Sequence, residues 1–166
     1  LLIRVLPGLL LVSLCVAPAA WAHRGIDEQI QAVSSEIEKD PQDAALFLRR
    51  GELHRIHRDW DKAEADYLAA RKLDSGLAAV DFCLGRMKLQ AGRPAEAKPA
   101  LERYLARRPD DPEGWVTQGR TLAKLGEYVA AAEAFTHAVE HSGRDRPRPE
   151  YYLERARALQ AAGPKH

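Results

Sequence analysis

The 166-residue sequence has little of what catalytic and cofactor-binding proteins need. It contains two cysteines and one methionine. The cysteines are far apart in the chain, so the Cys-x-x-Cys pairs of zinc and redox sites are absent. No Gly-rich phosphate loop, nucleophile elbow or His-Glu-x-x-His motif occurs. The sequence therefore identifies no catalytic residue, no metal site and no cofactor, and we expect a protein that is not an enzyme.

A strong charge of either sign is also missing. There are 25 Lys and Arg against 24 Asp and Glu, and aromatic residues make up only 7% of the chain. A nearly neutral chain has no overall attraction to nucleic acid. The aromatic residues recur at core spacing rather than as a platform on which bases would stack. We therefore expect no nucleic-acid partner.

Long hydrophobic runs are absent except near the start. Arg4 precedes an apolar run from Val5 to Val16, which is too short to span a bilayer comfortably. Small residues surround Trp21 directly afterwards. The pattern predicts a secretory signal peptide over residues 1–22, cleaved after Ala22, with a retained anchor helix as the alternative. We expect a periplasmic or secreted protein that leaves the membrane once the signal is removed.

Removal of that segment makes the rest formally neutral, because Arg4 carries its only charge. Cys83 is then the one remaining thiol. Its place beside Leu84 in an expected helix predicts a buried, unreactive side chain. The remaining length is sufficient for one continuous core without disulfides or metal.

A repeat with a period of 34 residues dominates what the sequence does contain. Three registers keep this period, one of glycines, one of alanines and one of large apolar residues. They are Gly51, Gly85 and Gly119; Ala63, Ala97 and Ala131; and Tyr67, Leu101 and Phe135. A fixed period of this length is typical of stacked repeat proteins.

The third copy shows why the pattern predicts helical hairpins. Trp115, Gly119 and Leu122 recur at spacings of four and three, which is one face of a helix. Glycine inside a helix costs about 1 kcal/mol relative to alanine, so we expect Gly119 where a second backbone comes close. Gly126 provides the turn before the second helix. One such hairpin cannot bury its own apolar face, so the copies must stack.

The residues Trp115, Gly119, Ala131 and Phe135 resemble the tetratricopeptide repeat, whose pattern is W-x2-L-G-x2-Y followed by A-x3-F. The departures in this copy are Gln118, Leu122 and Gly143, at the family's Leu, Tyr and Pro positions. The resemblance covers about Ala44 to Gly163. It implies an all-α, right-handed superhelix of stacked antiparallel hairpins with a concave groove lined by the first helices.

We predict three full repeats with a capping helix at each end. The predicted parts are a capping helix within residues 23–42 and a repeat domain over 43–166, with repeats at about 44–77, 78–111 and 112–145 and a partial repeat at 149–163. Asp59 is expected to cap the second helix of the first repeat. Pro99 should bend or fray its helix. The partial repeat follows an insertion of three residues, because Ala156 lies 37 residues after Gly119.

The predicted groove carries several basic side chains. The residues expected to bind a peptide there are Leu48, Glu52, Arg55, Phe82, Arg86, Leu89, Val116, Arg120, Lys124, Leu153 and Arg157. One stripe contains Glu52, Arg86, Arg120 and Arg157. Because Arg binds carboxylates with two parallel hydrogen bonds, the expected partner is a peptide with acidic side chains or a free C-terminus. The alternative is a solvated face on which each Arg pairs with a neighbouring Glu.

The resemblance implies a non-catalytic protein-interaction module, here an adaptor or assembly scaffold in the periplasm. One alternative is an accessory factor in the maturation of exported metalloproteins or cytochromes. Another is metal binding through the helical pairs His54 with His57 or His137 with His141, although neither pair has a third ligand nearby. A further alternative is a dimer formed through the last helix, with Tyr151 and Leu153 in contact.

Overall fold

The computed structural model describes residues 20–143 and 148–163, which form eight α-helices and no strand. The helices are α1 (Ala20–Lys39), α2 (Ala44–Ile56), α3 (Trp60–Leu73), α4 (Ala78–Gln90), α5 (Pro94–Arg107), α6 (Pro112–Lys124), α7 (Tyr128–His141) and α8 (Pro149–Ala162). Within that part of the chain, no helix is both long and apolar enough to cross a membrane.

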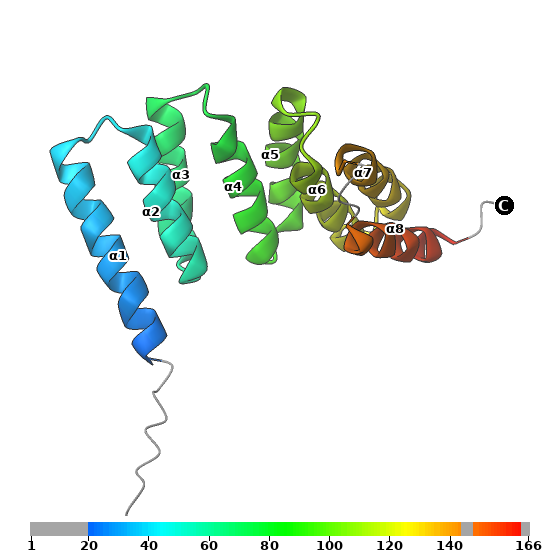
Figure 1. Cartoon of the computed structure of the whole chain (residues 1–166), viewed down its shortest axis with the longest axis horizontal. Coiled ribbons are helices and arrows are strands. Elements are labelled where there is room, and N and C mark those ends of the chain that lie inside the picture. The colour runs from blue at the N-terminus through cyan, green and yellow to red at the C-terminus, as the bar shows by residue number, and fades with distance from the viewer. Residues whose placement is uncertain (1–19, 144–147, 164–166) are drawn as a thin grey trace, which may run out of the picture.

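The helices form three hairpins, α2 with α3, α4 with α5 and α6 with α7, and each hairpin packs on the next. The first helix lies against α2 and the last lies against α7, so that the row curves from one end to the other (Figure 1). This confirms the predicted all-α stack with a single helix at each end.

The three periodic glycines lie where the helices of a hairpin touch, but what they accommodate differs from the prediction. A Cβ atom on Gly51, Gly85 or Gly119 would lie only 2.5–2.7 Å from a large side chain of the partner helix. These side chains are Tyr67, Leu101 and Phe135, sixteen residues after each glycine. Each glycine therefore makes room chiefly for a buried side chain rather than for a neighbouring backbone.

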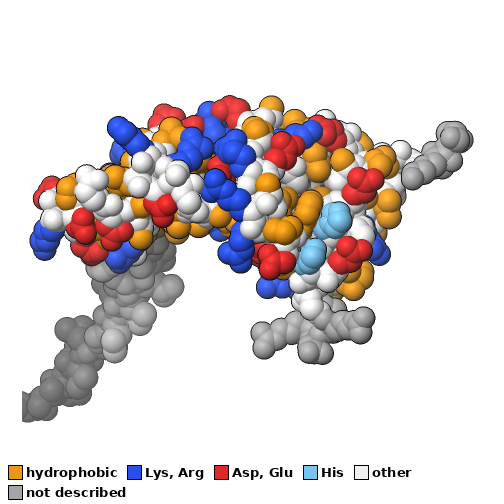
Figure 2. All heavy atoms as spheres, turned by 90° about the horizontal axis from the view of Figure 1, so that it is seen from above, with side chains coloured by type: hydrophobic (Ala, Val, Ile, Leu, Met, Phe, Trp, Pro, Cys, Tyr) orange, Lys and Arg blue, Asp and Glu red, His pale blue; other side chains and the backbone are white. Residues whose placement is uncertain are grey.

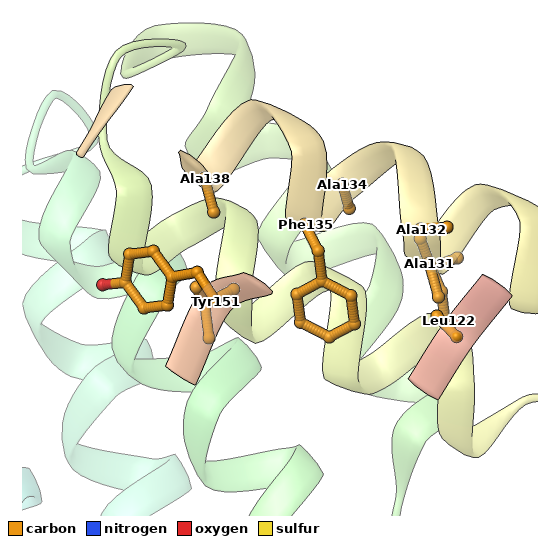
Figure 3. Close-up of a cluster of buried hydrophobic side chains, with 9 residues drawn as sticks. Leu122, Ala131, Ala132, Ala134, Phe135, Ala138 and Tyr151 are labelled. Atoms are coloured by element: carbon orange, nitrogen blue, oxygen red, sulfur yellow. The ribbon is translucent and has the colours of Figure 1, made fainter. Parts of the chain in front are cut away.

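In the third repeat the ring of Phe135 fills this space and is 1% exposed (Figure 3). Ala131 and Ala138 lie on the same face of α7 and are fully buried, which lets α6 approach. Tyr151 of α8 is also buried, and its hydroxyl donates a hydrogen bond of 2.8 Å to Glu113. Tyr151 therefore belongs to the interior, and the prediction that it forms a dimer contact was wrong.

Several helices begin at a proline or directly after an aspartate. Pro94 and Pro112 stand in the first turn of their helices, where a missing N–H costs nothing. The carboxylate of Asp111 accepts hydrogen bonds from two N–H groups of α6. Asp59 is the N-cap residue of α3, as predicted, and its backbone carbonyl accepts a hydrogen bond from the N–H of Ala63. Its carboxylate makes no capping hydrogen bond and pairs with His57 and Lys62 instead. Helix α5 runs without a break through Pro99, so the predicted fraying is not seen.

One turn departs from the repeat. Gly92 and Gly126 end the first helices of the second and third repeats with φ angles of 75° and 80°. The equivalent residue of the first repeat is Arg58, which keeps the same left-handed conformation with φ 64°. A side chain is strained in this conformation, which glycine adopts freely.

The N-terminal capping helix begins at Ala20, earlier than predicted, so that Ala22 and His23 lie within α1. The predicted signal peptide falls mainly on residues 1–19, outside the described residues. In α1, Val33 and Ile37 are buried against the stack. The opposite side of this helix carries exposed polar side chains, as expected for a capping helix.

Candidate functional site

The first helices of successive repeats line a hollow in the middle of the stack. Its volume is about 420 Å³. It lies between α4 and α6 and is lined by Phe82, Arg86, Leu89, Gln90, Glu113, Thr117 and Arg120. Four of the predicted groove residues are therefore brought together around one concavity.

A second hollow of about 470 Å³ adjoins the first and extends toward α8. Leu89 and Arg120 line both hollows, and Lys124, Ala123 and Glu154 complete the second. The two hollows together form a groove across α4, α6 and α8, which we call the central groove. It combines apolar side chains with guanidinium and ammonium groups.

The N-terminal side of this groove is held by an ion-pair network. The guanidinium of Arg86 lies 2.5 Å from the carboxylate of Glu52, the equivalent residue of the preceding repeat. Arg55 donates to the same carboxylate and to Gln90, the latter at 2.8 Å. Arg86 also lies over the ring of Phe82, 5.1 Å from its centre. These contacts fix the position of Arg86 at the edge of the groove.

Burial of Glu52 raises the pKa of its carboxyl group, but the neighbouring hydrogen-bond donors and positive charge have a larger opposite effect. Hydrogen bonds from Tyr67 and Arg55 and the charge of Arg86 lower that pKa below its ordinary value. Burial, together with the nearby Glu52, raises the pKa of the Cys83 thiol to about 12. The thiol is therefore protonated, in agreement with its predicted buried state.

The C-terminal side of the groove is arranged differently from the prediction. Arg120 pairs with Glu154 of α8 at 3.1 Å. Arg157, which the three-residue insertion places at the position of Arg120 in its repeat, is exposed and is not among the residues that line the two hollows. Arg86 and Arg120 both already have an acidic neighbour, which is the arrangement of the alternative hypothesis.

Basic groups nevertheless remain in excess around the groove. Lys124 and Arg157 are exposed, and no ion pair is found for either among residues 20–143 and 148–163. The Nε atom of Arg86 is buried and has no hydrogen-bond partner in that part of the chain. Figure 2 shows one face of the molecule, on which Lys and Arg side chains gather over the middle of the stack with acidic side chains among them.

The remaining predicted groove residues are three apolar side chains that differ in exposure. Val116 is 1% exposed and belongs to the core, so the prediction that it binds a peptide in the groove was wrong. Leu48 is partly buried against the core of the first two repeats. Leu153 is half exposed on α8. Only one of these three side chains is therefore broadly available to a partner.

Sequence analysis missed a third hollow, of about 420 Å³, at the α2–α3 turn. It is lined by Arg55, Ile56, Arg58, Trp60 and Gln90. Ile56 is an exposed large apolar residue. The signal that could have revealed this place is Arg58, a bulky residue at a position where the other repeats have glycine.

In both histidine pairs that were considered for metal binding, one histidine packs against neighbouring side chains of the stack. His54 is buried between α2 and α3, 3.6 Å from Asp59 and 4.0 Å from Asp66. Burial lowers the pKa of its ring, although Asp66 opposes this shift. The ring of His137 lies against Trp115, with 4.4 Å between ring centres. No group of three or more metal-ligating side chains suited to an ion is found among the described residues.

Comparison with known proteins agrees with this architecture. Residues 84–151 match the family model described as a tetratricopeptide repeat. No curated protein matches the sequence. The fold is the tetratricopeptide solenoid, a right-handed superhelix of stacked helical hairpins, as predicted.

Three solved structures illustrate the likeness. MamA from Desulfovibrio magneticus RS-1 superposes with a TM-score of 0.70 at 16% identity, covering 86% of this chain and 85% of that chain. The Arabidopsis OM64 tetratricopeptide domain gives 0.65 at 17% identity, covering 70% and 94%. The first such domain of Spaghetti (RPAP3), bound to the HSP90 peptide SRMEEVD, gives 0.68 at 15% identity, covering 74% and 95%. At these identities the likeness concerns the fold alone.

Proposed function

We propose that this protein is a non-catalytic adaptor that holds a segment of another protein in the central groove. The observation that carries this proposal is the pair of adjoining hollows between α4, α6 and α8. Such a surface combines apolar patches with hydrogen-bond donors, as grooves that bind extended or helical peptides do.

The preferred ligand is a segment with acidic side chains or a free C-terminal carboxylate. Arg86 and Arg120 line the same hollow from adjacent repeats. Lys124 lines the adjoining hollow with Arg120 and Glu154, and no ion pair is found for it in the described part of the chain. Leu89, between the two hollows, would contact an apolar side chain of the ligand. A carboxylate entering the groove would compete with Glu52 and Glu154 for the two guanidinium groups, which favours a ligand with several acidic groups.

The peptide in the RPAP3 structure provides a useful probe because it is acidic. Synthetic SRMEEVD would be compared with SRMQQVN, in which Gln and Asn replace the acidic side chains, and with the same peptides carrying an amidated C-terminus. We expect both acidic side chains and the free carboxylate to increase affinity in fluorescence anisotropy, and the increase to shrink at high salt. Equal binding of the acidic and neutral peptides would contradict the proposed ligand chemistry.

The groove itself is tested with the double variant Arg86→Glu and Arg120→Glu. Reversal of both charges should remove acidic-peptide binding and capture of the natural partner from the host. The matched control is Arg49→Glu with Arg108→Glu, because both of these side chains are exposed and lie outside the groove. If the groove variant and the control bind equally well, the central groove is not the binding site.

We also propose that the protein acts in the periplasm or outside the cell, after removal of residues 1–22. The apolar run and the small residues before His23 support this location. N-terminal sequencing of the protein isolated from its host tests the proposal. A chain that begins at His23 is expected, and a chain that retains residues 1–22 would favour the anchor-helix alternative.

A further inference from the structure

The two ends of the solenoid differ in chemistry. At the N-terminal end, the outer side of α1 is polar and includes the exposed residues Asp27, Glu28, Gln31 and Glu38. At the C-terminal end, Leu159, Val129 and Tyr152 are 56%, 51% and 43% exposed. A polar outer surface is what a terminal repeat needs in water. The partial repeat was expected to cap this end, but its outer surface is apolar.

The repeat pattern explains this exposed surface. Tyr152, Ala156 and Leu159 form one stripe on α8, equivalent to Trp115, Gly119 and Leu122 on α6. The stripe on α6 is covered by α7, and Leu122 is only 5% exposed as a result. No helix in the described part of the chain covers the stripe on α8. Within residues 20–143 and 148–163, the fourth repeat thus has its first helix but lacks the second helix that buries it in the other three repeats.

A groove marks the place where that second helix would lie. It has a volume of about 460 Å³ and runs between α7 and α8. Val129, Ala132, Glu133 and Thr136 line one side, and Leu159 lines the other with the end of α8. We call this groove the terminal groove. It lies at the end of the stack, whereas the central groove crosses the first helices.

We propose that the terminal groove binds an amphipathic helix of a partner protein, which completes the fourth repeat in trans. The chain itself shows what such a helix must present. In α3 and α7 the covering face is an alanine, a large apolar residue four positions later and an alanine three positions after that. The partner helix should carry this row of small, large and small residues and run antiparallel to α8.

Two residues refine the partner's chemistry. Ala156 replaces the glycine that faces Tyr67, Leu101 or Phe135 in the other repeats. Its extra methyl group leaves less depth, so the large residue of the partner should be Val rather than Phe. Glu133 lines the groove, and no ion pair is found for it within the described ranges, so a Lys or Arg of the partner should face it.

The first measurement uses a fluorescent peptide that copies residues 127–141 with Val in place of Phe135. This peptide carries the row of small, large and small residues but no Lys or Arg, so it tests the apolar contact alone. We expect saturable binding to the full chain and about tenfold weaker binding to Leu159→Glu. Ala161→Glu is the matched control, because it adds the same charge to the opposite, exposed side of α8 and should bind normally. Equal binding to wild type and Leu159→Glu would overturn the proposal.

A second pair of measurements tests the depth of the groove. The peptide with the original Phe should bind wild type less tightly than the Val peptide, and Ala156→Gly should reverse this order. An unchanged order would contradict the assignment of Ala156 to the floor of the groove.

An intramolecular version covers the case of weak peptide binding. A copy of residues 127–141, with Val for Phe135, is attached directly after Gly163, where its effective concentration is high. The melting temperature of this fusion protein should exceed that of the wild type, and the Leu159→Glu substitution in the fusion protein should cancel the increase. No increase, together with no peptide binding, would show that the groove does not accept a helix.

Light scattering over a range of concentrations shows whether the terminal groove binds a second copy of this chain or a partner protein. A dimer that Leu159→Glu dissociates would assign the groove to self-association and overturn the partner-helix proposal. A monomer that binds the Val peptide supports it. These experiments are independent of the central groove, since they leave Arg86 and Arg120 unchanged.

Discussion

Replacement of Gly119 by alanine tests the packing principle of the whole stack. The new Cβ atom would lie 2.7 Å from Cε1 of Phe135 and 2.9 Å from two further ring atoms. Carbon atoms normally approach to about 3.5–4.0 Å, so the overlap is about 1 Å. The ring cannot move away easily, because it is 1% exposed and enclosed by α6 and α7.

Two effects oppose each other in this variant. Alanine stabilises a helix by about 1 kcal/mol relative to glycine, whereas overpacking in a core costs about 1–3 kcal/mol. We expect overpacking to prevail and the free energy of unfolding to fall by about 1 kcal/mol. Urea unfolding followed by far-ultraviolet circular dichroism measures this change through the transition midpoint.

Gly25→Ala is the control, because a Cβ atom on Gly25 has no neighbour within 4 Å. This variant should gain up to about 1 kcal/mol from helix propensity alone. In a Phe135→Val background the closest ring atoms are absent, so Gly119→Ala should change sign and become stabilising. A stabilising Gly119→Ala in the wild type, or the same effect in both backgrounds, would refute the reasoning.

Three further predictions concern single residues. Arg58→Gly should raise the free energy of unfolding by about 1 kcal/mol by removing strain at φ 64°, whereas Arg58→Ala, which keeps a Cβ atom, should not give this gain in the same urea assay. Glu52→Gln should destabilise the protein by about 1–3 kcal/mol at neutral pH, because it leaves Arg86 and Arg55 without their shared carboxylate. Folding lowers the pKa of Glu52, so its carboxylate stabilises the protein above the ordinary pKa of 4.5, and this stabilisation is lost as the pH falls below that value. The Glu52→Gln variant should therefore lose less stability on acidification than the wild type. Folding also lowers the pKa of His54, so stability should decrease as the pH falls through 6.5, and a His54→Gln variant should lack this decrease in thermal unfolding measured between pH 7.5 and 5.5.

The architecture could be predicted because it depends on local and periodic information. A glycine, an alanine and a large apolar residue at a constant period of 34 require the same hairpin three times. Helix starts could also be located, since Pro94 and Pro112 restrict the backbone at the first turn regardless of tertiary contacts. The periodic glycines were assigned to the correct helix interface, but the sequence did not show that each of them faces a large side chain rather than a backbone.

The candidate sites could be predicted only in part. The sequence placed Arg86 and Arg120 on one stripe, and both line the central groove. It could not show that Glu154 would pair with Arg120, because that contact depends on how α8 lies beside α6 in space rather than on spacing along the chain. Nor could it show that Val116 would be buried, since burial there depends on how α8 packs against α6 and α7.

The sequence by itself determined the helical repeat, the number of hairpins and the residues that lie on each helix face, because these follow from spacing along the chain. Only the tertiary structure decided which charges pair across repeats and which apolar face stays uncovered. The terminal groove is the clearest case. Its stripe on α8 looks like a core stripe in the sequence, and it becomes an exposed surface because no described helix packs on it.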